Sequence, residues 1–190
     1  VGCGACFSLC RRPGAVHLVN IRNIGIRPIF DDHICAGCKD CLAFCPGFRI
    51  DANDTNAETN TQPRIANPLI GPTFSIWEGH AADDDIRMQG SSGGIITALA
   101  ASCLEQEKMA LVVHTGMDPD KPWLNKTVIS RDRYDLIDNA GSRYATSSPC
   151  ELLNVIEEST LPCVFIGKPC DAAAVAQARK VRPRLDANLG

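Results

Sequence analysis

Residues 35–46 read CAGCKDCLAFCP, with the spacing C-x₂-C-x₂-C-x₃-C-P. Gaps of two residues let one tight loop direct three thiolates at a single inorganic centre. A small residue such as Gly37 lets backbone N–H groups approach that centre closely. The stretch therefore predicts a metal or metal–sulfur site. Its candidate ligands are Cys35, Cys38, Cys41 and Cys45.

Two kinds of centre use cysteines spaced in this way. CxxC pairs bind zinc in many proteins. Zinc sites seldom combine three evenly spaced cysteines with a fourth that precedes proline. That arrangement is typical of two-cluster bacterial ferredoxins, in which three cysteines hold one [4Fe–4S] cluster and the fourth holds the other. The spacing favours iron and sulfide, with zinc as the alternative.

A shorter cysteine run precedes this one, because residues 3–10 read CGACFSLC. Relative to the later run, its first cysteine would fall one position before Val1, and Arg11 replaces the proline. The two runs form an internal repeat, whose spacing predicts two ligand sets. These sets are Cys35, Cys38, Cys41 and Cys10 for one cluster, and Cys3, Cys6, Cys45 and the missing cysteine for the other. Without that ligand the second cluster would have three irons or be lost.

Length and composition narrow the function classes. The chain has 190 residues, a hydrophobic content of 45% and a net charge of −3, so it can form a packed core and has no bulk charge favouring nucleic acid. The longest apolar stretch, residues 95–104, has the length of a core helix, and no signal peptide is evident. We expect no membrane span, and we interpret the two chain ends as those of a fragment.

Cysteine usage points to a reducing compartment. Seven of the 11 cysteines belong to the two runs, and the other four are scattered singly in apolar segments. Cluster assembly needs reduced thiols, so a cytoplasmic location is expected. Lone cysteines such as Cys103 and Cys163 are then interpreted as small hydrophobic residues.

The pattern predicts two domains with different folds. Apolar and polar residues alternate at 15–21 and 24–31, which predicts a hairpin. His17 is expected on a face of its first strand rather than at a metal. Residues 1–50 are therefore expected to form an α+β ferredoxin-like cluster domain. Residues 51–72, rich in Asn, Thr, Asp and Pro, are expected to be a linker. Residues 73–190 are expected to be an α/β domain, incomplete at its C-terminus.

In the second domain, strands and helices are expected to alternate. Strands are predicted at 73–80, 109–114, 123–130 and 162–166. One helix is predicted after Gly94, and its inward-facing residues are expected to be Ile95, Ile96, Leu99, Cys103 and Leu104. A second helix is predicted after the N-cap Ser148, with Leu152, Leu153 and Ile156 facing inward. A third helix is predicted over residues 172–180.

Three turns of this domain are candidate ligand sites. Residues 90–94, GSSGG, open a helix and could bind phosphate through free N–H groups, or be an ordinary turn. Residues 140–144 add Arg143, which suits phosphate, unless the turn is merely solvated. Residues 167–171 follow a buried strand, where Lys168 could stabilise a phosphate or an anionic flavin ring. Cys170 is open between reactive thiol, cluster ligand and buried hydrophobe.

A charged patch lies between the linker and the first of these turns. It comprises Glu78, His80, Asp83, Asp84, Asp85 and Arg87. Acid–base work is conceivable for carboxylates beside histidine. A solvated loop is the preferred interpretation of the aspartate run.

Taken in order, these motifs resemble the β subunit of coenzyme F420-reducing hydrogenase and its dehydrogenase relatives. The resemblance extends over essentially the whole chain. It rests on the two cysteine runs followed by WEGHA at 77–81, Ile86-Arg87, GSSGG at 90–94, GSRY at 141–144 and GKPC at 167–170. Relatives include formate dehydrogenase β subunits, F420H₂ oxidases and 7-hydroxymethyl chlorophyll a reductases.

The resemblance implies an iron–sulfur flavoprotein oxidoreductase. FAD would exchange a hydride with coenzyme F420 or a related carrier and pass single electrons to two [4Fe–4S] clusters and on to ferredoxin or to hydrogenase- or dehydrogenase-type partner subunits. No catalytic residue is assigned. The implied cofactor-binding residues are Ser91, Ser92, Gly93, Gly94, Ser142, Arg143, Lys168 and Cys170. Two alternatives stay open: an electron-transfer subunit without its own flavin, and a non-catalytic docking subunit.

Overall fold

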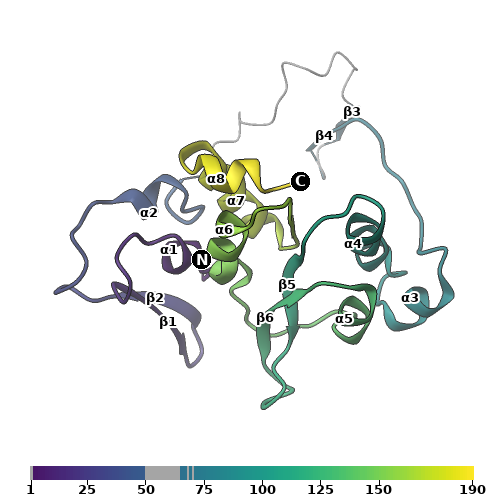
Figure 1. Ribbon diagram of the computed structural model, residues 1–190, viewed down its shortest axis with the longest axis horizontal. Coiled ribbons are helices and arrows are strands. Elements are labelled where there is room, and N and C mark those ends of the chain that lie inside the picture. Colours follow the sequence, from purple (N-terminus) through teal and green to yellow (C-terminus); the bar gives the residue numbers. More distant parts are fainter. Residues whose placement is uncertain (1, 50–64, 68, 70) are drawn as a thin grey trace.

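The computed structural model describes residues 2–49, 65–67, 69 and 71–190. It has a mixed α/β architecture, as expected. Two short helices and a hairpin from the N-terminal part lie on one side of Figure 1, and a three-stranded sheet with helices lies on the other. Helices near the C-terminus lie between them.

The two cysteine runs adopt the same local backbone, as an internal repeat should. Each has a one-turn helix, α1 (Ala5–Ser8) in the first run and α2 (Asp40–Ala43) in the second. Each helix follows a left-handed residue, Gly4 at φ +91° and Lys39 at φ +65°. Lysine rarely adopts this conformation, so the second run keeps the backbone geometry of the first at the cost of local strain at Lys39.

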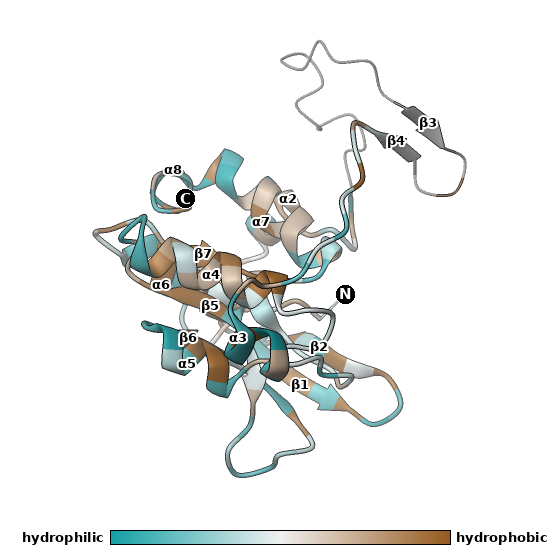
Figure 2. Cartoon of the chain, turned by 90° about the vertical axis from the view of Figure 1, so that its right-hand side faces the viewer, coloured by the Kyte–Doolittle hydropathy of each residue, from teal (hydrophilic) through white to brown (hydrophobic). Residues whose placement is uncertain are grey.

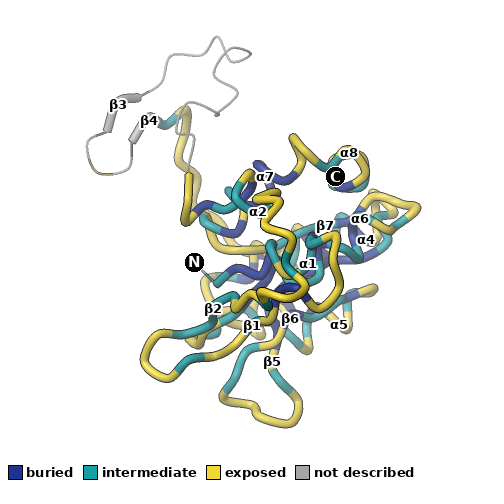
Figure 3. Tube along the Cα trace, turned by 90° about the vertical axis from the view of Figure 1, so that its left-hand side faces the viewer, coloured by how far each residue is buried: buried dark blue, intermediate teal, exposed yellow. Residues whose placement is uncertain are grey.

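The predicted hairpin between the runs is confirmed. Strands β1 (Val16–Ile21) and β2 (Gly25–Phe30) pair antiparallel, with left-handed Asn23 and Gly25 in the turn. Figure 3 shows that the tip of this hairpin is exposed.

A second small hairpin lies within the predicted linker. Strands β3 (Ile65–Asn67) and β4 (Gly71–Thr73) pair antiparallel, and residues 51–64 of the linker lie outside the described residues. The predicted strand at 73–80 is wrong, because β4 ends at Thr73 and residues 74–83 contain no helix or strand. Ile76 and Trp77 in this segment are 75% and 88% exposed, so no packing surface holds an extended strand there.

The three-stranded sheet has the order β6-β5-β7. Strand β5 (Val112–Met117) pairs antiparallel with β6 (Asn125–Ser130) and parallel with β7 (Val164–Phe165). Three of the predicted strands therefore exist, although β5 begins later and β7 is shorter than expected. Figure 2 shows hydrophobic residues gathered around β5 and β7. Neighbouring Val112 and Val113 point to opposite faces and belong to different cores.

Helices cover both faces of this sheet. The helices after residue 80 are α3 (Asp84–Gln89), α4 (Ile95–Glu105), α5 (Arg133–Asp138), the 3₁₀ turn η1 (Pro149–Leu152), α6 (Leu153–Glu158), α7 (Pro169–Val181) and α8 (Pro183–Ala187). Helices α3, α4 and α5 share one core with Val112. Helices α6, α7 and α8 share the other with Val113.

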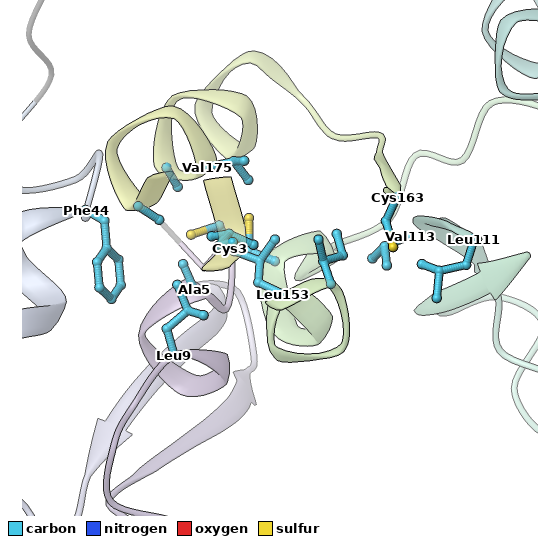
Figure 4. Close-up of a cluster of buried hydrophobic side chains, with 14 residues drawn as sticks. Cys3, Ala5, Leu9, Phe44, Leu111, Val113, Leu153, Cys163 and Val175 are labelled. Atoms are coloured by element: carbon cyan, nitrogen blue, oxygen red, sulfur yellow. The ribbon is translucent and has the colours of Figure 1, made fainter. Parts of the chain in front are cut away.

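This second core also includes the cysteine runs. Cys3, Ala5, Leu9 and Phe44 pack in one cluster with Leu153 and the other buried residues of α6 and α7, as Figure 4 shows. Two hydrogen bonds also link Ser8 to Asn154, at 2.9 and 2.8 Å. The N-terminal segment and the α/β part thus share one hydrophobic core. The predicted division into two domains by a linker at residues 51–72 stays a prediction.

Two details of the helices differ from the predictions. In α4 the buried residues are Ala100, Ala101 and Leu104, whereas Ile96 and Leu99 are 63% and 62% exposed. Leu153 and Ile156 are fully buried, as predicted, but Ser148 does not cap η1. Within the part of the chain that the structure describes, no helix combines the length and apolar character needed to cross a bilayer.

Candidate functional site

A cavity of about 420 Å³ lies where α4 begins and where β7 ends. This volume is in the range of small-molecule sites. Segments far apart in sequence meet there: 90–97, 114–115, 139–149 and 166–168 all contribute to the wall. Six of the eight predicted cofactor residues line it, namely Ser91, Ser92, Gly94, Ser142, Arg143 and Lys168.

The N-terminus of α4 faces this cavity without a side-chain cap. Gly94 occupies the N-cap position at φ +71°, and no side chain accepts from the first turn. A Cβ at Gly94 would lie 2.7 Å from the Ile86 carbonyl oxygen, so glycine is required there. The free N–H groups of Ile95, Ile96 and Thr97 and the helix dipole together favour an anion at this end of the cavity.

The two predicted cations at the cavity already have protein partners. Arg143 donates to Asn125 Oδ1 at 2.8 Å and to the Pro122 carbonyl at 2.7 Å, so it fastens the loop between β5 and β6. Lys168 Nζ lies 2.7 Å from Asp171 Oδ2 and 3.4 Å from Ser147 Oγ. The Lys168 side chain remains 54% exposed, which leaves it able to face a ligand as well.

Two predicted residues do not line the cavity. Gly93 instead packs against His80, and its carbonyl accepts from the Ala81 N–H at 2.7 Å. Cys170 is partly buried, and its Sγ lies 3.9 Å from Asp171 Oδ1.

The aspartate run of the charged patch is structural. The Asp83 side chain accepts from the Ile86 N–H at the start of α3 and also pairs with Arg133. The pKa of Asp83 is lowered by these contacts, first by the Ile86 N–H. His80 is exposed beside it. The loop interpretation is wrong for Asp84 and Asp85, which form the first turn of α3, although both are exposed to solvent as expected.

Sequence reasoning missed His114, which also lines the cavity. It follows Val113 in β5 and is only 7% exposed, and its Nε2 lies 2.7 Å from Ser130 Oγ. Burial lowers the pKa of His114, since a charged imidazole is poorly solvated there. The available signal in the sequence was the position of this histidine at the end of the apolar run 109–114.

Acid should therefore destabilise the protein through His114. Below about pH 6.5 the unfolded chain binds a proton that the folded chain resists, so the free energy of unfolding falls as pH drops through this range. His114→Gln keeps an amide for Ser130 and removes the titration. Urea unfolding at pH 7.5 and 5.5 should show a larger loss on acidification in the wild type than in H114Q. An equal loss in both would contradict the assignment.

Several of the seven cysteines of the two runs lie close enough to shift one another's pKa. The neighbours that raise the pKa of Cys41, after its burial, are Cys38, Cys35 and Cys10. Burial and the neighbours Cys3, Cys41 and Cys45 raise the pKa of Cys6 to about 12. All seven thiols are free of disulfides. Their proximity and donor type suit iron–sulfur ligation, in which a metal replaces the thiol protons.

The cavity and the first cysteine run share a wall. Ser147 and Pro149 line the cavity, while the residues that alternate with them contact the N-terminal loop. Ser148 Oγ donates to the Gly2 carbonyl at 2.7 Å, and the Cys150 N–H donates to the Cys3 carbonyl at 2.8 Å. One short segment therefore separates the cavity from a candidate cluster ligand.

Comparison with known proteins finds a family match over part of the chain. Residues 76–156 match the family model described as coenzyme F420 hydrogenase/dehydrogenase, beta subunit N-term. This segment is similar to the N-terminal part of that β-subunit family. The matched residues include the cavity turns at 90–94 and 141–143 and the wall segment 147–150. The cysteine runs and residues 166–168 lie outside the match.

Relatives within this family cover only part of the chain. Coenzyme F420 hydrogenase subunit β from Methanosarcina barkeri is 29% identical over 83 residues, which are 44% of this chain and 28% of the relative. A chain of the F420-reducing [NiFe] hydrogenase complex from the same organism, solved after xenon derivatization, has a TM-score of 0.53 and 25% identity. That similarity covers 58% of this chain and 39% of the other.

Proposed function

We propose that this chain is part of an iron–sulfur flavoprotein oxidoreductase. In this proposal, hydride exchange at FAD is coupled to single-electron transfer through two [4Fe–4S] clusters. The observation that supports it is the shared wall at residues 147–150, which lines the cavity on one side and contacts Cys3 on the other. The relationship to a hydrogenase β subunit supports the same class of chemistry.

Two cysteine sets would hold the clusters. Cys35, Cys38, Cys41 and Cys10 form one, and Cys3, Cys6 and Cys45 contribute to the other. The grouping of thiols around Cys41 and around Cys6 supports this assignment. Burial of Cys3 at 7% exposure would shield its cluster from water, one of the factors that set a reduction potential.

The cavity would hold FAD through its charged and dipolar wall. The N–H groups at the start of α4 would bind a phosphate, with Ser91 and Ser92 beside it. Lys168, kept in place by Asp171, would lie near the ring or a phosphate. When bound, FAD supplies the conversion between hydride and single-electron chemistry, and the protein supplies position and charge.

The partners follow from the same proposal. A hydride-carrying small molecule is required on one side, and coenzyme F420 is the first candidate because the relative's name includes it. Ferredoxin or hydrogenase- or dehydrogenase-type subunits would exchange single electrons with the clusters, as one related chain is part of a hydrogenase complex. Such chemistry with oxygen-sensitive clusters suits the cytoplasm.

Thr97 offers a direct test of the anion site. It is the third residue of α4 and lines the cavity. Thr97→Glu places a carboxylate in the first helical turn, which is compatible with the helix dipole but repels a phosphate. We expect Thr97→Glu to weaken FAD binding by about tenfold or more. The neutral control Thr97→Gln should bind within about twofold of the wild type.

The readout is quenching of flavin fluorescence during titration of flavin-depleted protein. Thermal unfolding of both variants checks that α4 is intact. Equal FAD affinity in Thr97→Glu and Thr97→Gln would remove the α4 terminus from the flavin site.

A further inference from the structure

Cys150 is a buried thiol to which the proposed function gives no role. It is fully buried, in η1, and far in sequence from both cysteine runs. Its Sγ, the Cys3 Sγ and a carboxylate oxygen of Asp171 all lie within 4.8 Å of one another. Each of these three residues is at least nine-tenths buried, so the two thiols and the carboxylate meet in the protein interior and not at its surface.

The backbone holds Cys150 against Cys3. The Cys150 N–H donates to the Cys3 carbonyl at 2.8 Å, and the preceding Ser148 fastens Gly2. On the other side, a Cβ at Gly4 would lie 2.9 Å from the Glu151 nitrogen. Segments 148–151 and 2–4 therefore run in close contact.

The chemistry of this thiol is that of a hydrogen-bond donor. Its Sγ lies 3.7 Å from the backbone carbonyl of Asp171 and within 4.8 Å of the Cys3 Sγ, so its single proton can rotate toward either acceptor. Lys168 compensates the Asp171 carboxylate from the cavity side, at 2.7 Å. An S–H group is a weak donor to a neutral acceptor but a useful one to an anionic sulfur. Hydrogen bonds to cluster sulfurs favour the more negative, reduced state.

We propose that Cys150 donates a hydrogen bond to the Cys3 sulfur and thereby raises the reduction potential of the cluster that Cys3 holds. The proposal rests on the proposed function, since it needs that cluster. Because Pro149 lines the cavity, the adjusted cluster is the one beside the flavin site. Cys150 is thus a tuning residue and not a ligand.

Cys150→Ala tests this in the anaerobically purified full-length protein. We expect its iron and sulfide content to equal that of the wild type. In a redox titration followed by electron paramagnetic resonance, one cluster should become tenfold harder to reduce, a shift of about 59 mV to lower potential. Cys150→Ser keeps a donor and should restore the wild-type potential. The matched control is Cys163→Ala, a fully buried cysteine whose Sγ contacts the Leu161 carbonyl instead.

Each other outcome overturns the inference. Loss of iron in Cys150→Ala would make Cys150 a ligand, and an unchanged potential would make it a packing residue. Should Cys150→Ala not fold, Cys150→Val fills the site without a donor and gives the same comparison with Cys150→Ser. Absence of iron in the wild type would instead refute the proposed function itself.

Discussion

Replacing Cys41 with alanine is expected to remove one of the two proposed clusters. The thiols grouped around Cys41 are Cys38, Cys35 and Cys10, so the loss of one ligand opens that whole site. Iron should fall by about four atoms per chain. Electron transfer to a one-electron acceptor should fall by at least about 100-fold, because removing a ligand exceeds the effect of removing its supporting contacts.

Iron and sulfide analysis together with acceptor reduction measures this effect. Cys103→Ala is the matched control, because Cys103 lies on α4 and belongs to neither cysteine run. It should keep full iron content. A Cys41→Ala protein with the wild-type iron content would show that this run does not hold a cluster.

Replacing Leu153 with alanine is expected to lower the free energy of unfolding more than any other substitution proposed for this chain. Leu153 is fully buried in the core that Cys3, Ala5 and Leu9 share with the α/β part. Removing a buried leucine typically costs about 2–5 kcal/mol. A cost of about 3 kcal/mol corresponds to a Tm roughly 6–12 °C lower for a chain of this size.

The shape of the unfolding curve carries further information. Because one core fastens both parts, Leu153→Ala should shift a single transition for the cysteine runs and the sheet. Leu99→Ala, at a 62% exposed leucine, should cost less than about 0.5 kcal/mol. Two separate transitions, with only the later part affected by Leu153→Ala, would contradict the shared core.

Local patterns predicted those parts of the fold that depend on neighbouring residues. The cysteine spacing anticipated that the two runs repeat the same local structure, although not its short helices, and alternation anticipated β1 and β2. The helical period of α4 was correct and Leu104 is buried as predicted, but the rest of the predicted apolar face is not the buried one. Small Ala100 and Ala101 face the core, where they allow close packing, and the larger Ile96 and Leu99 remain exposed.

Contacts between distant segments were beyond the reach of the sequence. Nothing in the chain indicated that Cys150 meets Cys3, because that contact depends on tertiary packing. Ile76 and Trp77 suggested a strand through their residue types, yet no neighbouring strand exists among the described residues. The cavity itself was anticipated better, since glycine turns and a strand end are local features that the fold brings together.

Counting iron, sulfide and flavin per chain in the anaerobically purified full-length protein tests the central claim most directly. The account predicts about eight iron atoms, about eight sulfides and one FAD per chain. Iron and sulfide without flavin would instead indicate an electron-transfer subunit. Zinc in place of iron and sulfide would contradict the account.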